Sequence, residues 1–195
     1  MTVLYSDFKK LCEKTPYINK GIFYSELYLF LCCCWLNGVK VIYESGVKYG
    51  FSTMIMDQAF RGVIFSHDVD LSLLREFKWR RTTFIEGDST ELIPKALGEN
   101  GFTRAAVLID GPKGDKALAL KDECLQYECC KVVGVHDVQP GHGESMHSYD
   151  YGFRKTHGED LDSLIDADYA LKYPKGPGLA LWSASGDVAL KVRCT

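Results

Sequence analysis

Five carboxylate side chains stand at comparable places in the first part of the chain, each at or just after the end of a short apolar run. They are Glu44, Asp68, Asp88, Asp110 and Asp137. A carboxylate can accept hydrogen bonds from a ligand, take a proton as a general base, or bind a hard metal cation. Clustered carboxylates would weaken a purely structural fold, because like charges repel and lose hydration on burial. If the apolar runs are strands of one sheet, these acids predict a ligand site.

The apolar runs before these acids have the character of buried strands, and helical patterns lie between most of them. The predicted strands are 39–44, 63–65, 82–86, 105–109 and 131–135. The predicted helices are 3–14, 22–36, 52–60, 71–78, 90–97, 115–130 and 159–165. This alternation predicts an α/β fold, a Rossmann-like, doubly wound and mostly parallel sheet with right-handed crossovers. In such a sheet the ligand lies beyond the carboxyl ends of the strands, where the acids are.

The C-terminal part has a different pattern. Residues 139–157 are rich in Gly, His, Ser and Tyr and indicate a long loop over the site. Strands are predicted at 169–173, 179–184 and 188–192. The last two are joined at a short Ser-Gly-Asp turn and predict a C-terminal antiparallel hairpin at the edge of the sheet.

Composition and charge exclude several classes of protein. The chain has 195 residues, enough for one sizeable core, with 46% hydrophobic and 25% charged residues. A net charge of -3 without a dense Lys/Arg run gives no footprint for nucleic acid. The most hydrophobic window, 22–36, contains Glu26 and is shorter than the ~20 apolar residues that cross a bilayer. We therefore expect a single domain with neither nucleic acid nor a membrane as partner, and we leave the oligomeric state open, a homo-oligomer included.

The eight cysteines are partly contiguous, at 32–34 and 129–130, and form no CxxC pairs of the zinc-binding kind. They lie in apolar surroundings, which predicts buried and reduced thiols. No secretory signal is visible at the start of the sequence. These features predict a cytoplasmic protein.

A glycine turn at 46–50 joins the first strand to the following helix. Glycines let a backbone approach a ligand closely and adopt positive φ, and the first amides of a helix are unpaired donors. The turn lacks the GxGxxG pattern of dinucleotide sites, because Val47 and Lys48 stand where another glycine is needed. The GxxxxGK[ST] phosphate loop is absent too. The turn therefore predicts a nucleotide-like ligand without a pyrophosphate.

Five motifs in order resemble those of class I S-adenosylmethionine-dependent methyltransferases. IYESGVKYGFST (42–53) is similar to the first motif, and more closely to the ESGVxxGxST version of the cephalosporin-hydroxylase-like and macrocin-type sugar O-methyltransferase branch. The later motifs, SHDVD, EGDS, LIDGPKG and GVHDV, resemble those of the second to fifth strands. The set covers roughly residues 22–138, about two thirds of the chain.

The resemblance implies S-adenosylmethionine as the cofactor. Glu44 and Gly46 would lie by its amino acid part, and Asp68 would accept hydrogen bonds from the ribose hydroxyls, with Asp70 as the rival. Asp68 could also be an exposed strand-end acid without a ligand role. The complete set of expected cofactor-binding residues is Glu44, Gly46, Tyr49, Gly50, Ser52, Thr53, Asp68, Asp88, Ser89 and Asp110.

Methyl transfer from a sulfonium is an in-line displacement, so the protein must align the acceptor oxygen and remove its proton. A side-chain base or a divalent metal is therefore needed. The branch resemblance implies Mg²⁺, or another divalent cation, held by Asp110 and Asp137. However, His136 and Pro112-Lys113 stand where related enzymes often carry acids. Fewer oxygen ligands are therefore available for a hard cation. A metal requirement stays open.

Without a metal, the candidate bases are Asp137, His136 and His142, and Lys113 could stabilise an oxyanion. The resemblance implies an enzyme that methylates a hydroxyl of a small acceptor, with a sugar favoured, such as a deoxysugar like rhamnose on a glycan. Aromatic residues that could stack on a sugar ring are Tyr149, Tyr151, Phe153 and Trp182.

Two other functions compete with this one. The first is an NAD(P)-dependent oxidoreductase, which the missing third glycine disfavours. The second is a non-catalytic cofactor-binding protein of the same fold. On the methyltransferase hypothesis the single domain has three parts: N-terminal helices at 1–38, a cofactor-binding core at 39–138, and an acceptor loop with C-terminal strands at 139–195.

Overall fold

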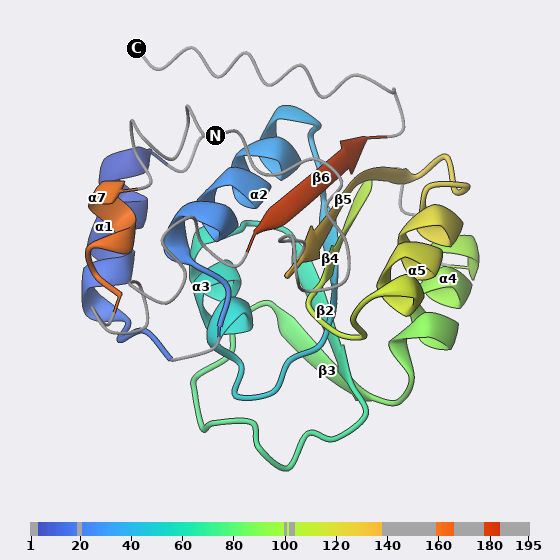
Figure 1. The fold of residues 1–195 in the computed structure, drawn as a ribbon, viewed down its shortest axis with the longest axis horizontal. Coiled ribbons are helices and arrows are strands. Elements are labelled where there is room, and N and C mark those ends of the chain that lie inside the picture. Colours follow the sequence, from blue (N-terminus) through green and yellow to red (C-terminus); the bar gives the residue numbers. More distant parts are fainter. Residues whose placement is uncertain are drawn as a thin grey trace.

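The computed structural model describes residues 4–18, 21–99, 101, 104–137, 159–165 and 178–183. Their strands form one sheet in the order β3-β2-β1-β4-β5-β6 (Figure 1). The strands are β1 (Val41–Ser45), β2 (Val63–Asp68), β3 (Thr82–Glu86), β4 (Ala105–Ile109), β5 (Cys130–His136) and β6 (Leu179–Ser183).

Strands β1 to β5 are parallel, and β6 runs antiparallel to β5 at the edge of the sheet. The chain leaves β1 towards β2 and β3 and then returns to the other side of β1 as β4. Such a reversal of strand order opens a crevice at the carboxyl ends of the strands. The predicted doubly wound, mostly parallel sheet is therefore confirmed. The predicted strands 169–173 and 188–192 and the loop 139–157 lie outside the described residues.

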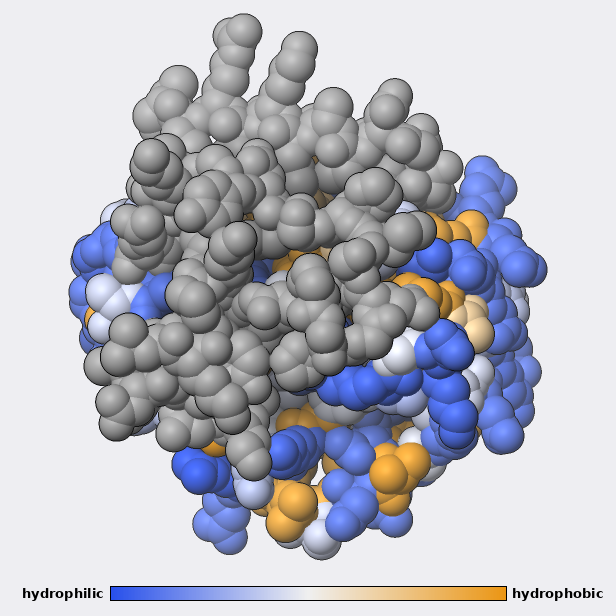
Figure 2. All heavy atoms as spheres, in the orientation of Figure 1, coloured by the Kyte–Doolittle hydropathy of each residue, from blue (hydrophilic) through white to orange (hydrophobic). Residues whose placement is uncertain are grey.

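Helices cover both faces of the sheet (Figure 1). They are α1 (Tyr5–Lys14), α2 (Tyr24–Leu36), α3 (Phe51–Ala59), α4 (Ser89–Glu99), α5 (Asp115–Cys124) and α7 (Glu159–Asp162). In Figure 1, α1, α2, α3 and α7 lie on one side and α4 and α5 on the other. Hydrophilic side chains cover the outer surface of α4 and α5 (Figure 2). In the described part of the chain, every helix is too short or too polar to cross a membrane.

Within the described residues, two apolar cores result from the alternation of side chains along the strands. On β1, Ile42 belongs to the core beneath α1, α2 and α3, whereas Val41 and Tyr43 belong to the core beneath α4 and α5. On β4, Leu108 belongs to the first of these cores and Val107 to the second. Successive side chains of a strand point to opposite faces, so both central strands are buried on both sides. This burial accounts for their continuous apolar sequence.

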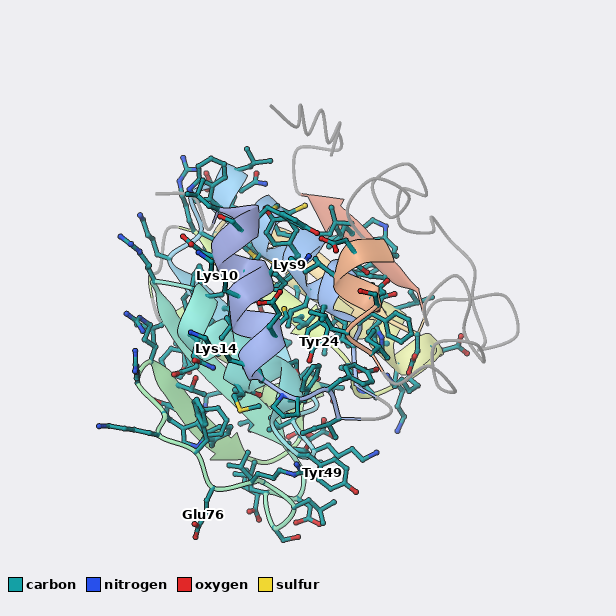
Figure 3. All side chains as sticks on the ribbon, turned by 90° about the vertical axis from the view of Figure 1, so that its left-hand side faces the viewer. Lys9, Lys10, Lys14, Tyr24, Tyr49 and Glu76 are labelled. Carbon is teal, nitrogen blue, oxygen red and sulfur yellow. The ribbon has the colours of Figure 1, made fainter. Side chains whose placement is uncertain are left out.

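Helix α2 is almost entirely apolar because it packs between β5 and α7. Its one charged residue, Glu26, is 1% exposed. Helix α1 lies outside this layer and carries Lys10 and Lys14 at the solvent surface (Figure 3). The buried charge of Glu26 in α2 requires polar partners, which lie at the carboxyl edge of the sheet.

The predicted helix at 71–78 is wrong, since the β2–β3 connection is irregular. On both sides of this segment, side-chain carboxylates accept hydrogen bonds from backbone amides. These hydrogen bonds compete with those of a helix. Asp70 accepts from the amide of Ser72, and the buried Asp57 accepts from the amides of Arg80 and Arg81. The helix predicted at 115–130 is also shorter than expected, because turns follow Cys124 and β5 begins at Cys130.

Candidate functional site

A cleft of about 870 Å³ lies at the carboxyl ends of β1 to β5. Each strand contributes the residues at or just after its end: Gly46, Asp68, Asp88, Asp110 and Asp137. Parallel strands end at the same edge of a sheet, and so acids that are distant in sequence meet here. Figure 2 shows apolar patches among charged groups over the β2–β3 connection, which supplies part of the rim. A cleft of this size suits a nucleoside-sized ligand.

Half of the residues predicted to bind a cofactor line the cleft: Gly46, Asp68, Asp88, Ser89 and Asp110. Of the residues predicted for catalysis or for a metal ion, Asp110, Lys113 and Asp137 line it, whereas His136 is not among the lining residues and is 4% exposed. His142, Tyr149, Tyr151 and Phe153 lie outside the described residues.

The other predicted cofactor residues, Glu44, Tyr49, Gly50, Ser52 and Thr53, are not among the lining residues. Tyr49 lies at the outer end of the turn beside the β2–β3 connection (Figure 3), with the guanidinium of Arg75 5.7 Å from its ring centre. Trp182 packs against the α4–α5 core, and the ammonium of Lys121 lies 4.8 Å from its ring centre.

The glycine turn packs directly against the turn after β4. Gly46 has φ 89°, and a Cβ added to it would lie 2.6 Å from the backbone nitrogen of Gly111. The amides of Asp110 and Gly111 both donate to the carbonyl of Ser45. Only glycine allows this conformation together with this approach of two backbones. The shape of the cleft floor therefore requires a glycine at position 46.

Glu44 is a buried structural hub beneath the turn. Its carboxylate accepts hydrogen bonds from the hydroxyls of Ser52 (2.5 Å), Thr53 (2.5 Å) and Ser66 (2.7 Å). Burial raises the pKa of Glu44 to about 7, although the three hydroxyl donors oppose the rise. Glu44 thereby joins β1, the first turn of α3 and β2, and this network accounts for the positions of Ser52 and Thr53.

Replacing Glu44 by Gln is expected to flatten the pH dependence of stability. Because the pKa of Glu44 rises from 4.5 to about 7 on folding, the native state binds more protons, and the free energy of unfolding falls as pH rises between these values. At about 1.4 kcal/mol for each pKa unit, the fall amounts to about 3 kcal/mol. Between pH 4.5 and pH 8, urea unfolding should show a loss about 3 kcal/mol larger in the wild type than in Glu44→Gln, because His136 titrates in both proteins. The exposed Glu86 gives a matched control as Glu86→Gln, and equal losses in all three proteins would contradict the assignment.

Asp68 caps the glycine turn. Its Oδ2 accepts the backbone amides of Val47 (2.7 Å) and Lys48 (2.8 Å), and its Oδ1 accepts the amide of Asp70 at 3.2 Å. Lys48 has φ 51°, in the left-handed region that non-glycine residues rarely adopt. The carboxylate thus holds the turn in shape from the end of β2 while its side chain lines the cleft.

Alternating charges form a chain through the inner end of the cleft: Glu26, His136, Asp110, Lys113 and Asp137. His136 Nδ1 donates to Asp110 Oδ1 at 2.6 Å. Lys113 Nζ lies 2.6 Å from Asp110 Oδ1 and 2.6 Å from Asp137 Oδ2. On the far side, His136 Nε2 is buried without a hydrogen-bond partner among the described residues, and Glu26 Oε2 lies 3.4 Å away.

The pKa values in this chain of charges keep its central members ionised at neutral pH. Burial would raise the pKa of Asp110, but the His136 and Lys113 cations hold it far below its ordinary value of 3.8. Burial would lower the pKa of His136, but Asp110 and Glu26 raise it from 6.5 to about 10. The stability that His136 contributes is therefore present below pH 6.5 and is lost as the pH rises towards 10.

Asp137 adopts an unusual backbone conformation at the end of β5. Its φ of 63° lies in the left-handed region. Such conformations are retained where the surrounding structure demands them, and they gather at functional sites. Here the conformation accompanies the ion pair between the Asp137 carboxylate and Lys113.

Glu26 is the residue that sequence reasoning missed. Its Oε1 accepts the amide of Gly178 at 2.8 Å, and its Oε2 accepts the amide of Phe23 at 3.0 Å and faces His136. The available signal was a lone carboxylate in an apolar helix, since such a charge must find partners when it is buried. Nothing in the spacing indicated that the partner would be His136.

Asp110, His136 and Asp137 offer ligand atoms that all lie within 4.8 Å of one another, so they are close enough to hold a metal ion. Two of them, Asp110 and Asp137, are the predicted metal ligands. In this arrangement, however, the Lys113 ammonium already lies against both carboxylates, and His136 Nδ1 donates to Asp110. The groups as arranged fit a bound ammonium better than a divalent cation.

No protein-family model matches the chain. No curated protein matches it. Among solved structures, the chain is similar to a protein from Klebsiella pneumoniae assigned as an O-methyltransferase, with 16% identity and a TM-score of 0.51 over 94% of this chain and 90% of that one. It is also similar to the S-adenosylhomocysteine-bound methyltransferase PaMTH1 of Podospora anserina, with 13% identity and a TM-score of 0.48 over 93% and 87% of the two chains. The mycinamycin-pathway methyltransferase MycE, solved with Mg, S-adenosylhomocysteine and mycinamycin VI, matches at 20% identity and a TM-score of 0.47 over 80% of this chain and 45% of its own. The likeness to the Klebsiella protein shows that the chain has the Rossmann-like fold predicted from its sequence.

Proposed function

We propose that the chain is an S-adenosylmethionine-dependent O-methyltransferase that acts on a hydroxyl of a small acceptor. The observation that carries this proposal is the charge of the cleft. Among the described residues, its lining holds six carboxylates, from Asp68, Asp70, Asp88, Asp110, Glu123 and Asp137, and three lysines, Lys48, Lys113 and Lys116. This excess suits a ligand with an ammonium, a sulfonium and two ribose hydroxyls. It opposes a nicotinamide dinucleotide, whose pyrophosphate needs cations and free amides.

The residues around the cleft have distinct roles in this proposal. S-adenosylmethionine supplies an electrophilic methyl group on a sulfonium. Gly46 provides backbone without a side chain at the cleft floor, Asp68 accepts from the ribose hydroxyls, and Asp88 and Ser89 lie at the adenine side. The fold shared with the Klebsiella protein, which is assigned as an O-methyltransferase, supports the same class of reaction.

Asp137 is the general base of the proposed reaction. It takes the proton of the acceptor hydroxyl, and Lys113 stabilises the negative charge that develops on the oxygen. His136 does not fit this role, because it is 4% exposed and both of its ring nitrogens face carboxylates. It acts as a positioning residue that fixes Asp110. Asp110, Lys113 and Asp137 line the same cleft as Gly46, which disfavours a non-catalytic binding protein.

The acceptor is a sugar hydroxyl in this proposal, a deoxysugar such as rhamnose on a glycan included, and the motif at 42–53 supports this choice. Residues 39–138 hold the cofactor, 1–38 supply the helical layer, and 139–195 form the acceptor side. The buried thiols of Cys33, Cys34, Cys124 and Cys130, whose pKa values burial raises, suit the reducing cytoplasm.

Titration calorimetry with S-adenosylhomocysteine and with NAD tests the cofactor. Binding of the first alone is the expected result, and binding of NAD alone would overturn the proposal. A panel of sugars and small phenols, assayed for methyl uptake, then tests the acceptor. Methyl uptake by phenols without uptake by sugars would keep the reaction class and reject the sugar.

An Asp68→Asn variant is expected to bind S-adenosylhomocysteine at least tenfold more weakly, because hydrogen bonds to a charged acceptor are each worth about 1.5–3 kcal/mol. The amide oxygen of Asn can still accept the Val47 and Lys48 amides, so the turn should survive. Asp70→Asn is the matched control, because Asp70 lines the same cleft and its carboxylate also accepts a backbone amide. If the control weakens binding and Asp68→Asn does not, the ribose acceptor is Asp70.

A further inference from the structure

The ammonium of Lys113 occupies the position of a bridging cation between the ends of β4 and β5. Its Nζ lies 2.6 Å from Asp110 Oδ1 and 2.6 Å from Asp137 Oδ2. These two carboxylates belong to the group whose ligand atoms gather within 4.8 Å. A metal ion held by both carboxylates would lie next to the Lys113 ammonium, and two cations this close repel each other. Lys113 and such a metal ion therefore exclude each other.

The third potential ligand in this cluster is turned away from the cleft. His136 is 4% exposed, its Nδ1 donates to Asp110 Oδ1, and its Nε2 lies 3.4 Å from Glu26 Oε2. Neither nitrogen is thus presented to an ion in the cleft. In the cleft, the cluster therefore presents the carboxylates of Asp110 and Asp137, which share the ammonium of Lys113.

The local sequence keeps Lys113 at this position. Lys113 follows Asp110 by three residues, across Gly111 and Pro112, and proline restricts the backbone of the connecting turn. A tethered ammonium is always present at the carboxylates, whereas a metal ion must be taken up from solution. The lysine ammonium is a compact charge with three N–H donors. Two of them are used by the two carboxylates, and the third can donate to a further oxygen.

We propose that Lys113 is a built-in cation that replaces a divalent metal ion at Asp110 and Asp137. The cluster binds no divalent cation tightly while Lys113 is in place. The remaining donor of the ammonium contacts the acceptor oxygen, and this second part rests on the proposed methyl transfer. The exclusion of metal does not rest on the proposed methyl transfer. An experiment can therefore reject either part of the proposal without rejecting the other.

Calorimetric titration with MnCl₂ or MgCl₂ alone tests the exclusion of metal. The proteins are the wild type, Lys113→Met and Lys116→Met, the last removing a charge from the same cleft without touching the Asp110–Asp137 pair. Lys113→Met is expected to bind one Mn²⁺ at least tenfold more tightly than the wild type, and Lys116→Met to behave as the wild type. The double variant Lys113→Met/Asp137→Asn should lose the gained affinity. Equal affinities in the wild type and Lys113→Met, whether tight or undetectable, overturn the proposal.

The folding of each variant is checked by thermal unfolding, and the wild type provides a test that needs no variant. Wild-type protein is expected to show no Mn²⁺ binding tighter than the millimolar range, and micromolar binding would overturn the proposal. In methyl transfer assays, EDTA should leave wild-type turnover unchanged, whereas Lys113→Met should lose turnover and regain part of it with Mn²⁺. Inactivation of the wild type by EDTA would contradict the built-in cation. A lack of S-adenosylhomocysteine binding would reject the proposed function and leave the metal titration interpretable.

Discussion

Substitution of Gly46 by Ala is expected to lower the free energy of unfolding by about 3 kcal/mol and to abolish cofactor binding. A left-handed conformation costs a non-glycine residue about 1–2 kcal/mol, and overpacking costs a further 1–3 kcal/mol or so. Gly46 has φ 89°, and its new Cβ would lie 2.6 Å from Gly111 N and 3.0 Å from the carbonyl carbon of Asp110. These are backbone atoms that cannot rotate away, so the turns after β1 and β4 must separate. Urea unfolding and calorimetry with S-adenosylhomocysteine measure the two effects.

Gly38→Ala is the matched control for this substitution. Gly38 also has a positive φ, 62°, but a Cβ there meets only the side chain of Arg104 at 3.5 Å. It should therefore show the conformational cost of about 1 kcal/mol alone and leave the cleft intact. If Gly46→Ala is no less stable than Gly38→Ala, the two turns can move apart freely and Gly46 does not define the cleft floor.

An Asp110→Asn variant is expected to lose about 3 kcal/mol of stability at neutral pH, because it leaves the buried His136 cation without its partner, and breaking a buried ion pair costs about 3–5 kcal/mol. Asp110 is the shared partner of His136 and Lys113, at 2.6 Å from each, and the variant leaves both cations without it. The loss should be smaller at pH 10 than at pH 7, because His136, with its pKa near 10, is then partly neutral even in the wild type. Urea unfolding at the two pH values measures this difference.

The pair Lys121–Asp122, whose acid is exposed, provides the control for charge removal as such. Its two atoms also lie 2.6 Å apart, but the Asp122 side chain is 68% exposed, and Asp122→Asn should cost less than about 1 kcal/mol. The double variant Asp110→Asn/His136→Gln should recover part of the lost stability, because the uncompensated imidazolium is gone. Strict additivity of the two single variants would show that Asp110 and His136 are not coupled.

Two strands were predictable from the types of their residues. Strands β3 and β4 have the expected bounds, 82–86 and 105–109, because their residues are β-branched, aromatic or uniformly apolar. Strand β2 was predicted to end at residue 65 but continues to Asp68. Its extension contains Ser66 and His67, polar residues that are buried because Ser66 donates to Glu44 and His67 lies against the Glu44 carbonyl. A pattern of hydrophobicity contains no signal for partners of this kind.

The candidate site was predictable in its location and less so in its contacts. Topology brings Gly46, Asp68, Asp88, Asp110 and Asp137 to one cleft, and the order of the motifs was sufficient for that expectation. Glu44 occupies an expected position, and hydroxyl donors from α3 and β2 enclose its carboxylate, which the sequence did not indicate. Such local competition depends on side-chain distances, which spacing along a sequence does not contain.

The contacts of Glu26 set the order in which this chain can mature. Its carboxylate faces His136 and accepts the amide of Gly178, 152 residues away in sequence. Closing a loop of this length is slow and entropically costly compared with forming neighbouring strands and helices. The inner end of the cleft therefore becomes complete only after residue 178 has been synthesised and docked, so that a growing chain with all five strand-end acids already in place still lacks a finished site. A chain truncated before residue 178 should therefore lack the hydrogen bond from the Gly178 amide to Glu26.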